Sequence, residues 1–188
     1  QGEAIYQVAS SRDNSEENVN GYPNTGSELT FHPSYNDFIG VRFRNVNIPQ
    51  GAVVTEAYLE FTAYSTTTYG NPSMRIRGVA DDDASDFHPD KRYRLRNLSK
   101  TSGITWSMPD FYNNYTYRTP DVSSIVKQIV DRSGWQSGND MAFILDDFVS
   151  YRGAHTYNNS PSKAPKLIVK FNGSATPNAS ATVREHLM

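Results

Sequence analysis

The stretch VRFRNVNIPQGAVVTEAYLEF, residues 41–61, decides the fold prediction. In residues 53–62 (VVTEAYLEFT) apolar and polar side chains alternate with a period of two, which is typical of a half-buried β-strand. The buried face is expected to carry Val53, Ala57, Leu59 and Phe61. Residues 38–46 (FIGVRFRNV) alternate in the same way. Residues 48–52 (IPQGA) suit a turn, because proline presets φ and glycine accepts a positive φ. We therefore expect two strands separated by a turn.

Short apolar or alternating segments recur through the rest of the chain. The further expected strands are residues 4–10, 28–32, 74–79, 104–106, 141–145 and 166–171. Residues 11–27 are rich in Asn, Glu, Ser and Gly, so they are predicted to form a long loop.

One helix interrupts this pattern. Thr119 and Pro120 form a start signal, with Thr as N-cap and Pro at the first helical position. Apolar residues then follow at helical spacing, namely Val122, Ile125, Val126, Ile129 and Val130. Many short strands with one helix predict an all-β fold: a two-sheet, jelly-roll-like β-sandwich with one short α-helix at about residues 121–132. The sandwich is expected over residues 1–171, and the small, polar residues 172–188 are predicted to be a C-terminal tail or linker.

The composition narrows the function classes. The 188 residues carry a net charge of −2, and only 20% of them are charged, so neither a nucleic-acid partner nor a membrane surface is indicated. No apolar run approaches the ~20 residues that span a bilayer, and membrane insertion is not expected. The absence of cysteine excludes disulfides, thiolate zinc sites and cysteine nucleophiles. Turn-rich chains with many tyrosines are typical of extracellular β proteins, so an extracellular or cell-surface location is predicted.

The order of several segments resembles a known family. The matching segments are residues 41–61, ITW at 104–106, TPDVSSIVKQIVDRSGWQSGNDMAFIL at 119–145 and APKLIVKF at 164–171. Together they resemble the DNRLRE-type domains of secreted bacterial and archaeal surface proteins, which include a carbohydrate-binding-module family that binds alginate. The resemblance covers roughly residues 4–171. It implies a jelly-roll-like sandwich with a non-catalytic role, and it does not supply a ligand.

An acidic run suggests a possible cofactor. Hard cations such as Ca²⁺ take several oxygen ligands from one flexible loop. The candidate ligands for a structural calcium ion are Asp81, Asp82, Asp83 and Asp86. The spacing is not that of an EF-hand. The alternative is a solvated acidic turn, balanced by the basic residues that follow it, Lys91, Arg92, Arg94 and Arg96. No other cofactor is expected.

Aromatic and hydrogen-bonding residues suggest a sugar site, because sugar rings stack on aromatic faces while amides and Arg bind hydroxyls. The candidate glycan-binding residues are Tyr112, Tyr115, Tyr117, Tyr151, Arg152 and Tyr157. The alternative is that these rings pack the loops against the sheet. Trp106 and Trp135 are predicted to be core residues. Arginines alternate on two strands (42, 44, 75, 77), and pairing with Glu56 and Glu60 is preferred over a basic strip.

Catalysis finds little support. The four histidines lie in four different sequence contexts, and the chain has no Gly-x-Ser-x-Gly elbow, no His-Glu-x-x-His and no phosphate loop. The predicted function is therefore a secreted, non-catalytic module that binds extracellular carbohydrate or mediates adhesion. The alternative is a self-assembling subunit of an extracellular filament or lattice, in which a terminal segment adds as a strand to the next copy. The expected partner is a polysaccharide or glycan, or copies of the chain itself.

Overall fold

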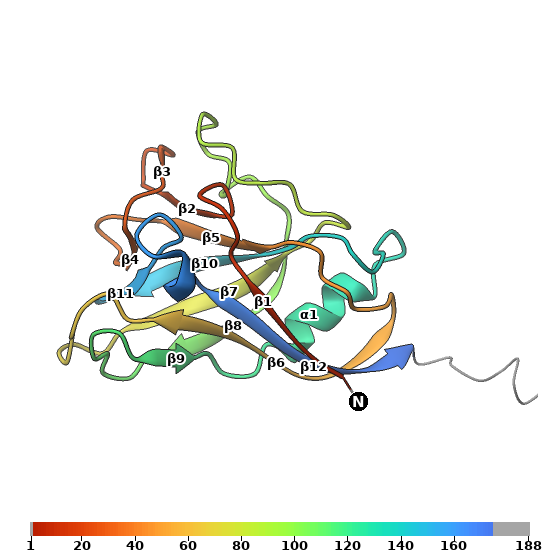
Figure 1. The fold of residues 1–188 in the computed structure, drawn as a ribbon. Coiled ribbons are helices and arrows are strands. Elements are labelled where there is room, and N and C mark those ends of the chain that lie inside the picture. Colours follow the sequence, from red (N-terminus) through yellow and green to blue (C-terminus); the bar gives the residue numbers. More distant parts are fainter. Residues whose placement is uncertain (1, 175–188) are drawn as a thin grey trace, which may run out of the picture.

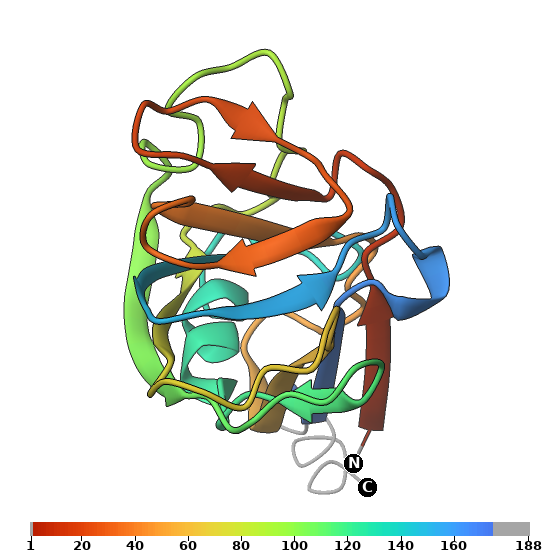
Figure 2. The same cartoon turned by 90° about the vertical axis from the view of Figure 1, so that its left-hand side faces the viewer.

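The structure is a computed structural model that describes residues 2–174, and it forms a β-sandwich with one helix (Figures 1 and 2). One sheet has four strands in the order β1-β12-β6-β9, and the other has six in the order β3-β2-β5-β10-β7-β8. A short pair, β11-β4, forms a third ladder. The predicted all-β sandwich with one short helix is confirmed.

The four-stranded sheet contains the strand that decided the prediction. It comprises β1 (Gly2–Gln7), β12 (Lys166–Ser174), β6 (Ala52–Thr62) and β9 (Thr116–Arg118). All of its pairings are antiparallel. Ala57, Leu59 and Phe61 are fully buried as predicted, but Val53 is 43% exposed. The register shifts between Lys170 and Phe171, whose partners on β6 are Glu56 and Val54. This irregularity breaks the period of two and explains the error at Val53.

The six-stranded sheet contributes more buried apolar residues than the four-stranded sheet. It comprises β3 (Pro23–Asn24), β2 (Asn14–Glu17), β5 (Phe38–Phe43), β10 (Met141–Val149), β7 (Ser73–Val79) and β8 (Lys100–Ser107). Ile39, Val41 and Phe43 point into the sandwich with no exposed surface. On the other face of the same sheet, Ala142 and Ile144 form a smaller apolar cluster with Phe87 from the long 80–99 connection.

The sides of the sandwich are closed by α1 (Ser123–Val130) and by β4 (Glu28–Phe31) with β11 (Arg152–His155). Helix α1 contacts β6 of one sheet and β7 and β8 of the other. Its four apolar residues, Ile125, Val126, Ile129 and Val130, are fully buried. Within residues 2–174, no helix is long and apolar enough to cross a membrane.

The helix begins three residues later than its sequence signal. The N-cap position is Val122, which makes no side-chain cap. Thr119 accepts a hydrogen bond from the backbone N–H of Leu59 instead (3.0 Å). Asp121 accepts from the N–H groups of both Ser123 (2.9 Å) and Ala57 (3.0 Å). The predicted cap residues therefore fasten the start of the helix to β6.

The predicted loop at residues 11–27 is wrong in part, since it contains β2 and β3. All four residues of β2 (NSEE) are buried although they are polar. Their side chains have internal partners, such as the bond from the N–H of Thr30 to Glu16 (2.7 Å). A buried polar strand has no apolar period to reveal it. At the other end, β12 pairs with β6 as far as Ser174, so the first three residues of the predicted tail belong to this strand. Residues 175–188 of that tail lie outside the described residues.

Trp106 and Trp135 are core residues as predicted, 4% and 1% exposed. The arginines of β5 and β7 do pair with carboxylates, but the predicted partners were wrong. Arg42 binds Asp13 (2.6 Å) and Asp140, and Arg75 binds Asp146 (3.0 Å). Glu56 and Glu60 bind Lys170 (3.0 Å) and Arg118 (3.0 Å) on their own sheet.

Candidate ligand-binding site

A cleft of about 460 Å³ opens beside the β4–β11 ladder. We call it the aromatic cleft. It is lined by Glu28, Thr30, His32, Tyr35, Tyr69, Ser150 and Tyr151. These residues come from β4 and the turn after it, from the connection between β6 and β7, and from the turn between β10 and β11. Three tyrosines thus meet in one depression although the chain separates them widely.

The rings of Tyr35 and Tyr69 are displayed to solvent, 65% and 64% exposed. The turn that carries Tyr35 is fixed from within, because the N–H groups of Tyr35 and Asn36 both donate to the His32 carbonyl (3.1 and 3.0 Å). The His32 ring packs edge-on against Tyr35, with centroids 5.3 Å apart. An exposed aromatic ring on a fixed turn is a ready contact surface for an apolar ligand face.

The wall behind Tyr69 depends on close backbone approach. Gly70 has φ +74, and a Cβ there would collide with the Ser150 side chain. Ser150 itself has φ 58, a left-handed conformation unusual for a residue with a side chain. Arg152 fixes the same loop from below by donating to the Tyr69 carbonyl (2.8 Å). The backbone at Gly70 and Ser150 therefore fixes the shape of this wall of the aromatic cleft.

Glu28 and Tyr151 set the chemistry of the cleft floor. The Tyr151 hydroxyl donates to the Glu28 carboxylate. Burial raises the pKa of Glu28 above its ordinary value, and the bond from Tyr151 partly offsets that rise. Burial and the bond to Glu28 raise the pKa of Tyr151 to about 12, so the phenol keeps its proton at neutral pH. The floor therefore presents a hydrogen-bonded pair of acceptor and hydroxyl groups.

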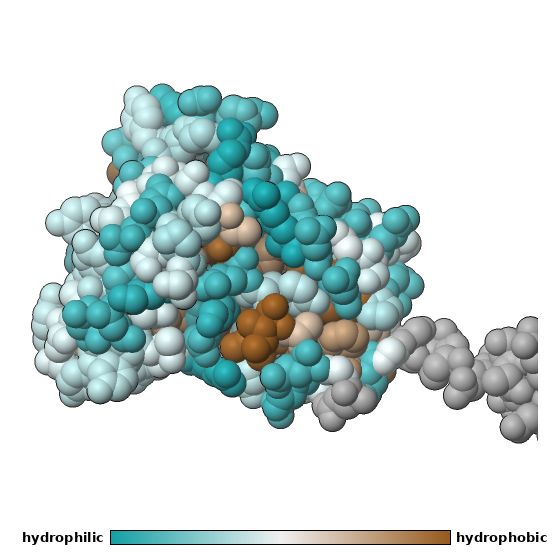
Figure 3. Space-filling model, in the orientation of Figure 1, coloured by the Kyte–Doolittle hydropathy of each residue, from teal (hydrophilic) through white to brown (hydrophobic). Residues whose placement is uncertain are grey.

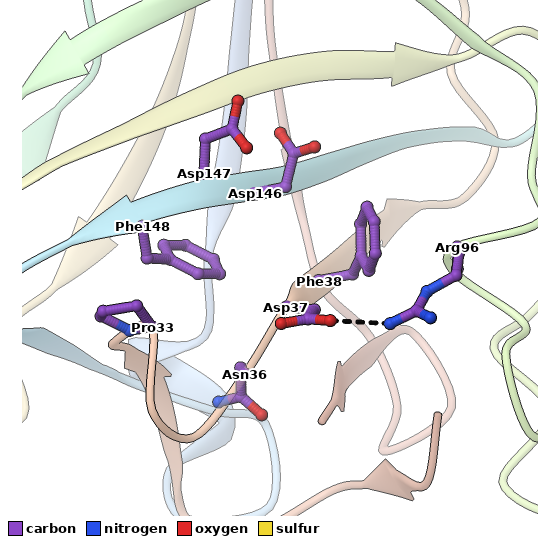
Figure 4. A pocket seen from close by; sticks show the side chains of 8 residues that line it. All are labelled: Pro33, Asn36, Asp37, Phe38, Arg96, Asp146, Asp147 and Phe148. Carbon is purple, nitrogen blue, oxygen red and sulfur yellow. Dashed lines mark hydrogen bonds and ion pairs between the residues drawn. The ribbon is translucent and has the colours of Figure 1, made fainter. Parts of the chain in front are cut away.

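A second hollow of about 410 Å³ lies next to the first, and we call it the polar cleft (Figure 4). Its lining residues are Pro33, Asn36, Asp37, Phe38, Arg96, Asp146, Asp147 and Phe148. The two clefts share the turn after β4 and the end of β10, so they adjoin along the chain. Charges in the polar cleft are matched. Arg96 binds Asp37 (2.7 Å), and Asp146 lies between Arg75 and Arg77.

The predicted sugar residues are divided among several places. Tyr112 and Tyr115 are exposed (50% and 68%), with ring centroids 6.4 Å apart, on the loop before β9. Tyr117 is half-buried, stacks on Phe111 at 4.3 Å, and accepts a hydrogen bond from the N–H of Tyr112 (2.8 Å). This ring packs the loop, as the structural alternative expected.

The remaining predicted sugar residues differ in their surroundings. Tyr151 lines the aromatic cleft. Arg152 is 1% exposed and donates to the carbonyls of Pro109 and Tyr69 (both 2.8 Å), so it supports the cleft from beneath. Tyr157 is half-buried against the core. The structure thus brings only Tyr151 of the predicted set into the aromatic cleft.

The predicted calcium ligands are not drawn together. Asp82 binds Arg132 (2.6 Å), and Asp86 binds Arg12 (2.6 Å). Asp81 and Asp83 accept backbone hydrogen bonds from Asp83 (3.2 Å) and Asp140 (2.8 Å). Among residues 2–174 no group of three or more His, Asp or Glu side chains is arranged to hold a metal ion. Within residues 2–174, each of the four aspartates therefore has its own binding partner.

Sequence reasoning missed Glu28, His32, Tyr35 and Tyr69. The local signal was an aromatic residue inside a turn: Tyr35 lies in HPSYND and Tyr69 in TTTYGNPS. Turns lie on the surface, so a large ring within one is displayed. The convergence of the two turns depends on sheet topology, which the sequence does not state.

Comparisons with known proteins add little to this geometry. No family model matches the chain, and no curated protein matches it. Among solved structures, the chain is similar to the crystal structure of dimeric latent PorU from Porphyromonas gingivalis. The identity is 9%, the match covers 91% of this chain and 12% of that chain, and the TM-score is 0.35. A likeness at that level carries no argument about function, and the resemblance to DNRLRE-type domains stays a prediction.

Proposed function

We propose that this protein is an extracellular, non-catalytic module that binds carbohydrate, and that the aromatic cleft is its binding site. The observation that carries the proposal is the convergence of Tyr35, Tyr69 and Tyr151 around one cleft. Tyrosine combines a rigid apolar face with a polar tip, which suits a sugar ring with its apolar C–H face and hydroxyl rim. Glu28, Thr30 and His32 supply hydrogen-bonding groups between the rings.

The charge of the cleft favours a neutral glycan over an acidic one. Its lining contains one carboxylate and neither Lys nor Arg. A uronic acid or sulfated sugar placed there would lie beside Glu28 without a compensating cation. A neutral hexose chain meets no such repulsion.

Binding to a panel of neutral and acidic oligosaccharides tests this proposal, with Tyr35→Ala and Tyr69→Ala as the test variants. Each should weaken binding about tenfold or more, because each removes a stacking platform worth roughly 1.5 kcal/mol or more of contact. Tyr112→Ala and Tyr115→Ala are the matched controls, since they remove rings of similar exposure from the loop before β9. Equal losses in both pairs, or in neither, would refute the assignment to the aromatic cleft.

A second candidate function is self-assembly through strand addition, and β1 supplies the observation that favours it. This strand is an edge of the four-stranded sheet, and it contains neither proline nor lysine. The bond from the N–H of Val8 to Pro165 shows that even-numbered residues of β1 face β12. Glu3, Ile5 and Gln7 therefore point their backbone groups outward, and Ile5 is 59% exposed. In Figure 3 a hydrophobic patch lies where β1 and β12 run across an otherwise mainly polar face. Unprotected edges of this type accept added strands.

A further inference from the structure

A small basic hollow lies in the long connection between β7 and β8. Its volume is about 220 Å³, and its lining residues are Lys91, Arg92, Tyr93, Arg94, Asn97 and Leu98. We call it the basic pocket. Three of its six lining residues are cations, and none is a carboxylate. Charge of one sign around a concave surface is the arrangement that concentrates a counter-ion.

Arg92 and Arg94 differ from the other arginines of the structure. Within residues 2–174 the chain has eleven arginines, and nine of them form an ion pair with a carboxylate. Arg92 and Arg94 are the two that form none in this part of the chain. Both line the basic pocket. A fold that neutralises nearly all its guanidinium groups leaves these two for a partner from outside.

The guanidinium of Arg92 is held in place without an acid. It lies over the ring of Tyr22 at 4.1 Å and over that of Tyr93 at 5.1 Å, and it donates to the Asn20 carbonyl (2.5 Å). Tyr93 adopts φ 57, and its ring packs onto Gly21, where a Cβ would collide with it. The side chain is therefore positioned before a ligand arrives, which lowers the entropy that binding would cost.

Arg94 has a donor without an acceptor. Its Nε is buried and has no hydrogen-bond partner, and one terminal nitrogen makes only a long bond to the Asp86 carbonyl (3.4 Å). A buried donor left unpaired costs about 1–3 kcal/mol. An anion with several oxygens would satisfy it. Two acids of the same connection are committed or displayed to solvent, since Asp86 binds Arg12 (2.6 Å) and Asp90 is 84% exposed beside His88.

We propose that the basic pocket binds a tetrahedral oxyanion, a phosphate or sulfate group. Three cations, the Asn97 amide and the unpaired Arg94 Nε suit a group with three or more accepting oxygens better than a single carboxylate. This site is separate from the aromatic cleft, and it does not depend on the carbohydrate proposal.

Titration with inorganic phosphate and inorganic sulfate, followed by backbone amide NMR shifts at constant ionic strength, tests the proposal. Saturable shifts are expected at residues 91–98. Arg94→Gln should weaken binding at least tenfold, and so should Arg92→Gln. Arg118→Gln is the matched control, because it removes one exposed positive charge from the other sheet and should leave the affinity unchanged.

Lys91→Gln guards against a folding artefact, since the Lys91 side chain is exposed. It should weaken binding without changing the melting temperature.

Phosphorylated and sulfated oligosaccharides then distinguish the two sources of the oxyanion. Tighter binding than that of the inorganic ion indicates a group carried by a glycan, and equal binding indicates the free anion. Shifts that never saturate, or an equal loss of affinity in Arg118→Gln, would overturn the proposal.

Discussion

At the scale of single residues, buried polar side chains organise the region around the clefts. Glu16 on β2 is 3% exposed and accepts hydrogen bonds from Asn24 (3.3 Å), from the N–H of Thr30 (2.7 Å) and from Asn36. Thr30 lines the aromatic cleft, and Asn36 lines the polar cleft. One carboxylate therefore fastens β3, β4 and the turn that the two clefts share. No apolar residue could make these bonds, which explains why β2 is polar where a core strand would be apolar.

Glu16 should make stability depend on pH. Burial raises its pKa to about 7, against an ordinary value of 4.5. A carboxyl whose pKa is raised by folding contributes stability that is complete below pH 4.5 and lost as pH rises through 7. The full effect of such a shift is roughly 3 kcal/mol. Unfolding by urea between pH 5 and pH 8 should show the decline. Glu16→Gln should flatten it, because a neutral amide keeps an acceptor for Thr30, and the Asn24 amide can turn to accept from the new NH₂. An unchanged slope in Glu16→Gln would contradict this assignment.

At the scale of elements, the strands and the helix with an apolar period were predictable, and the others were not. β6 follows from alternation and α1 from helical spacing, because each buries one apolar face or stripe, and β10 follows from a short apolar run that is buried on both faces. β2, β9 and β11 escaped, since their sequences (NSEE, TYR, RGAH) are short and have no apolar period; β2 and β11 are buried although they are largely polar, and β9 is mostly exposed. The candidate site depends on one of these missed elements, because β11 pairs with β4, which carries Glu28 and Thr30 of the cleft lining, and Tyr151 directly precedes β11. Of the predicted sugar residues only Tyr151 lines the cleft. Which turns lie side by side depends on the order of the strands in the sheets, and that order cannot be read from the local sequence.

Helix α1 should be essential to the sandwich, because it fills the space between the two sheets. Ile129 on its buried stripe has no exposed surface. Ile129→Ala removes its outer carbons and leaves a cavity, so the free energy of unfolding should fall by about 2–5 kcal/mol. Lys127→Ala on the exposed side of the same helix breaks an ion pair with Asp131 (2.7 Å) and should cost about 0.5 kcal/mol or less. Denaturant unfolding of the two variants side by side measures the difference. Similar losses would show that the helix is peripheral.

At the scale of the whole molecule, the two proposed functions, binding and assembly, involve different surfaces. The aromatic cleft lies at the β4–β11 side, and the candidate edge for strand addition is β1. The two proposed functions can therefore be removed one at a time. The donor strand in the assembly proposal is a terminal segment, and the end of β12 sets where a cut can be made. Ser174 still pairs with Ala52, so a cut after Phe171 would remove part of the sheet.

A chain ending at Ser174 keeps the whole of β12 and its pairs with β6. A chain ending at Phe171 should melt at a lower temperature, because it loses the pairs of Asn172 and Ser174 with β6, each hydrogen bond contributing about 1 kcal/mol.

If assembly proceeds by strand addition, the chain ending at Ser174 should remain monomeric in sedimentation at concentrations where the full chain polymerises. Ile5→Lys should have the same effect from the acceptor side, because an exposed lysine on an edge strand blocks pairing. Tyr35→Ala should polymerise as the full chain does. Polymers formed equally by the full chain, the Ser174 truncation and Ile5→Lys would exclude both the terminal donor and the β1 edge.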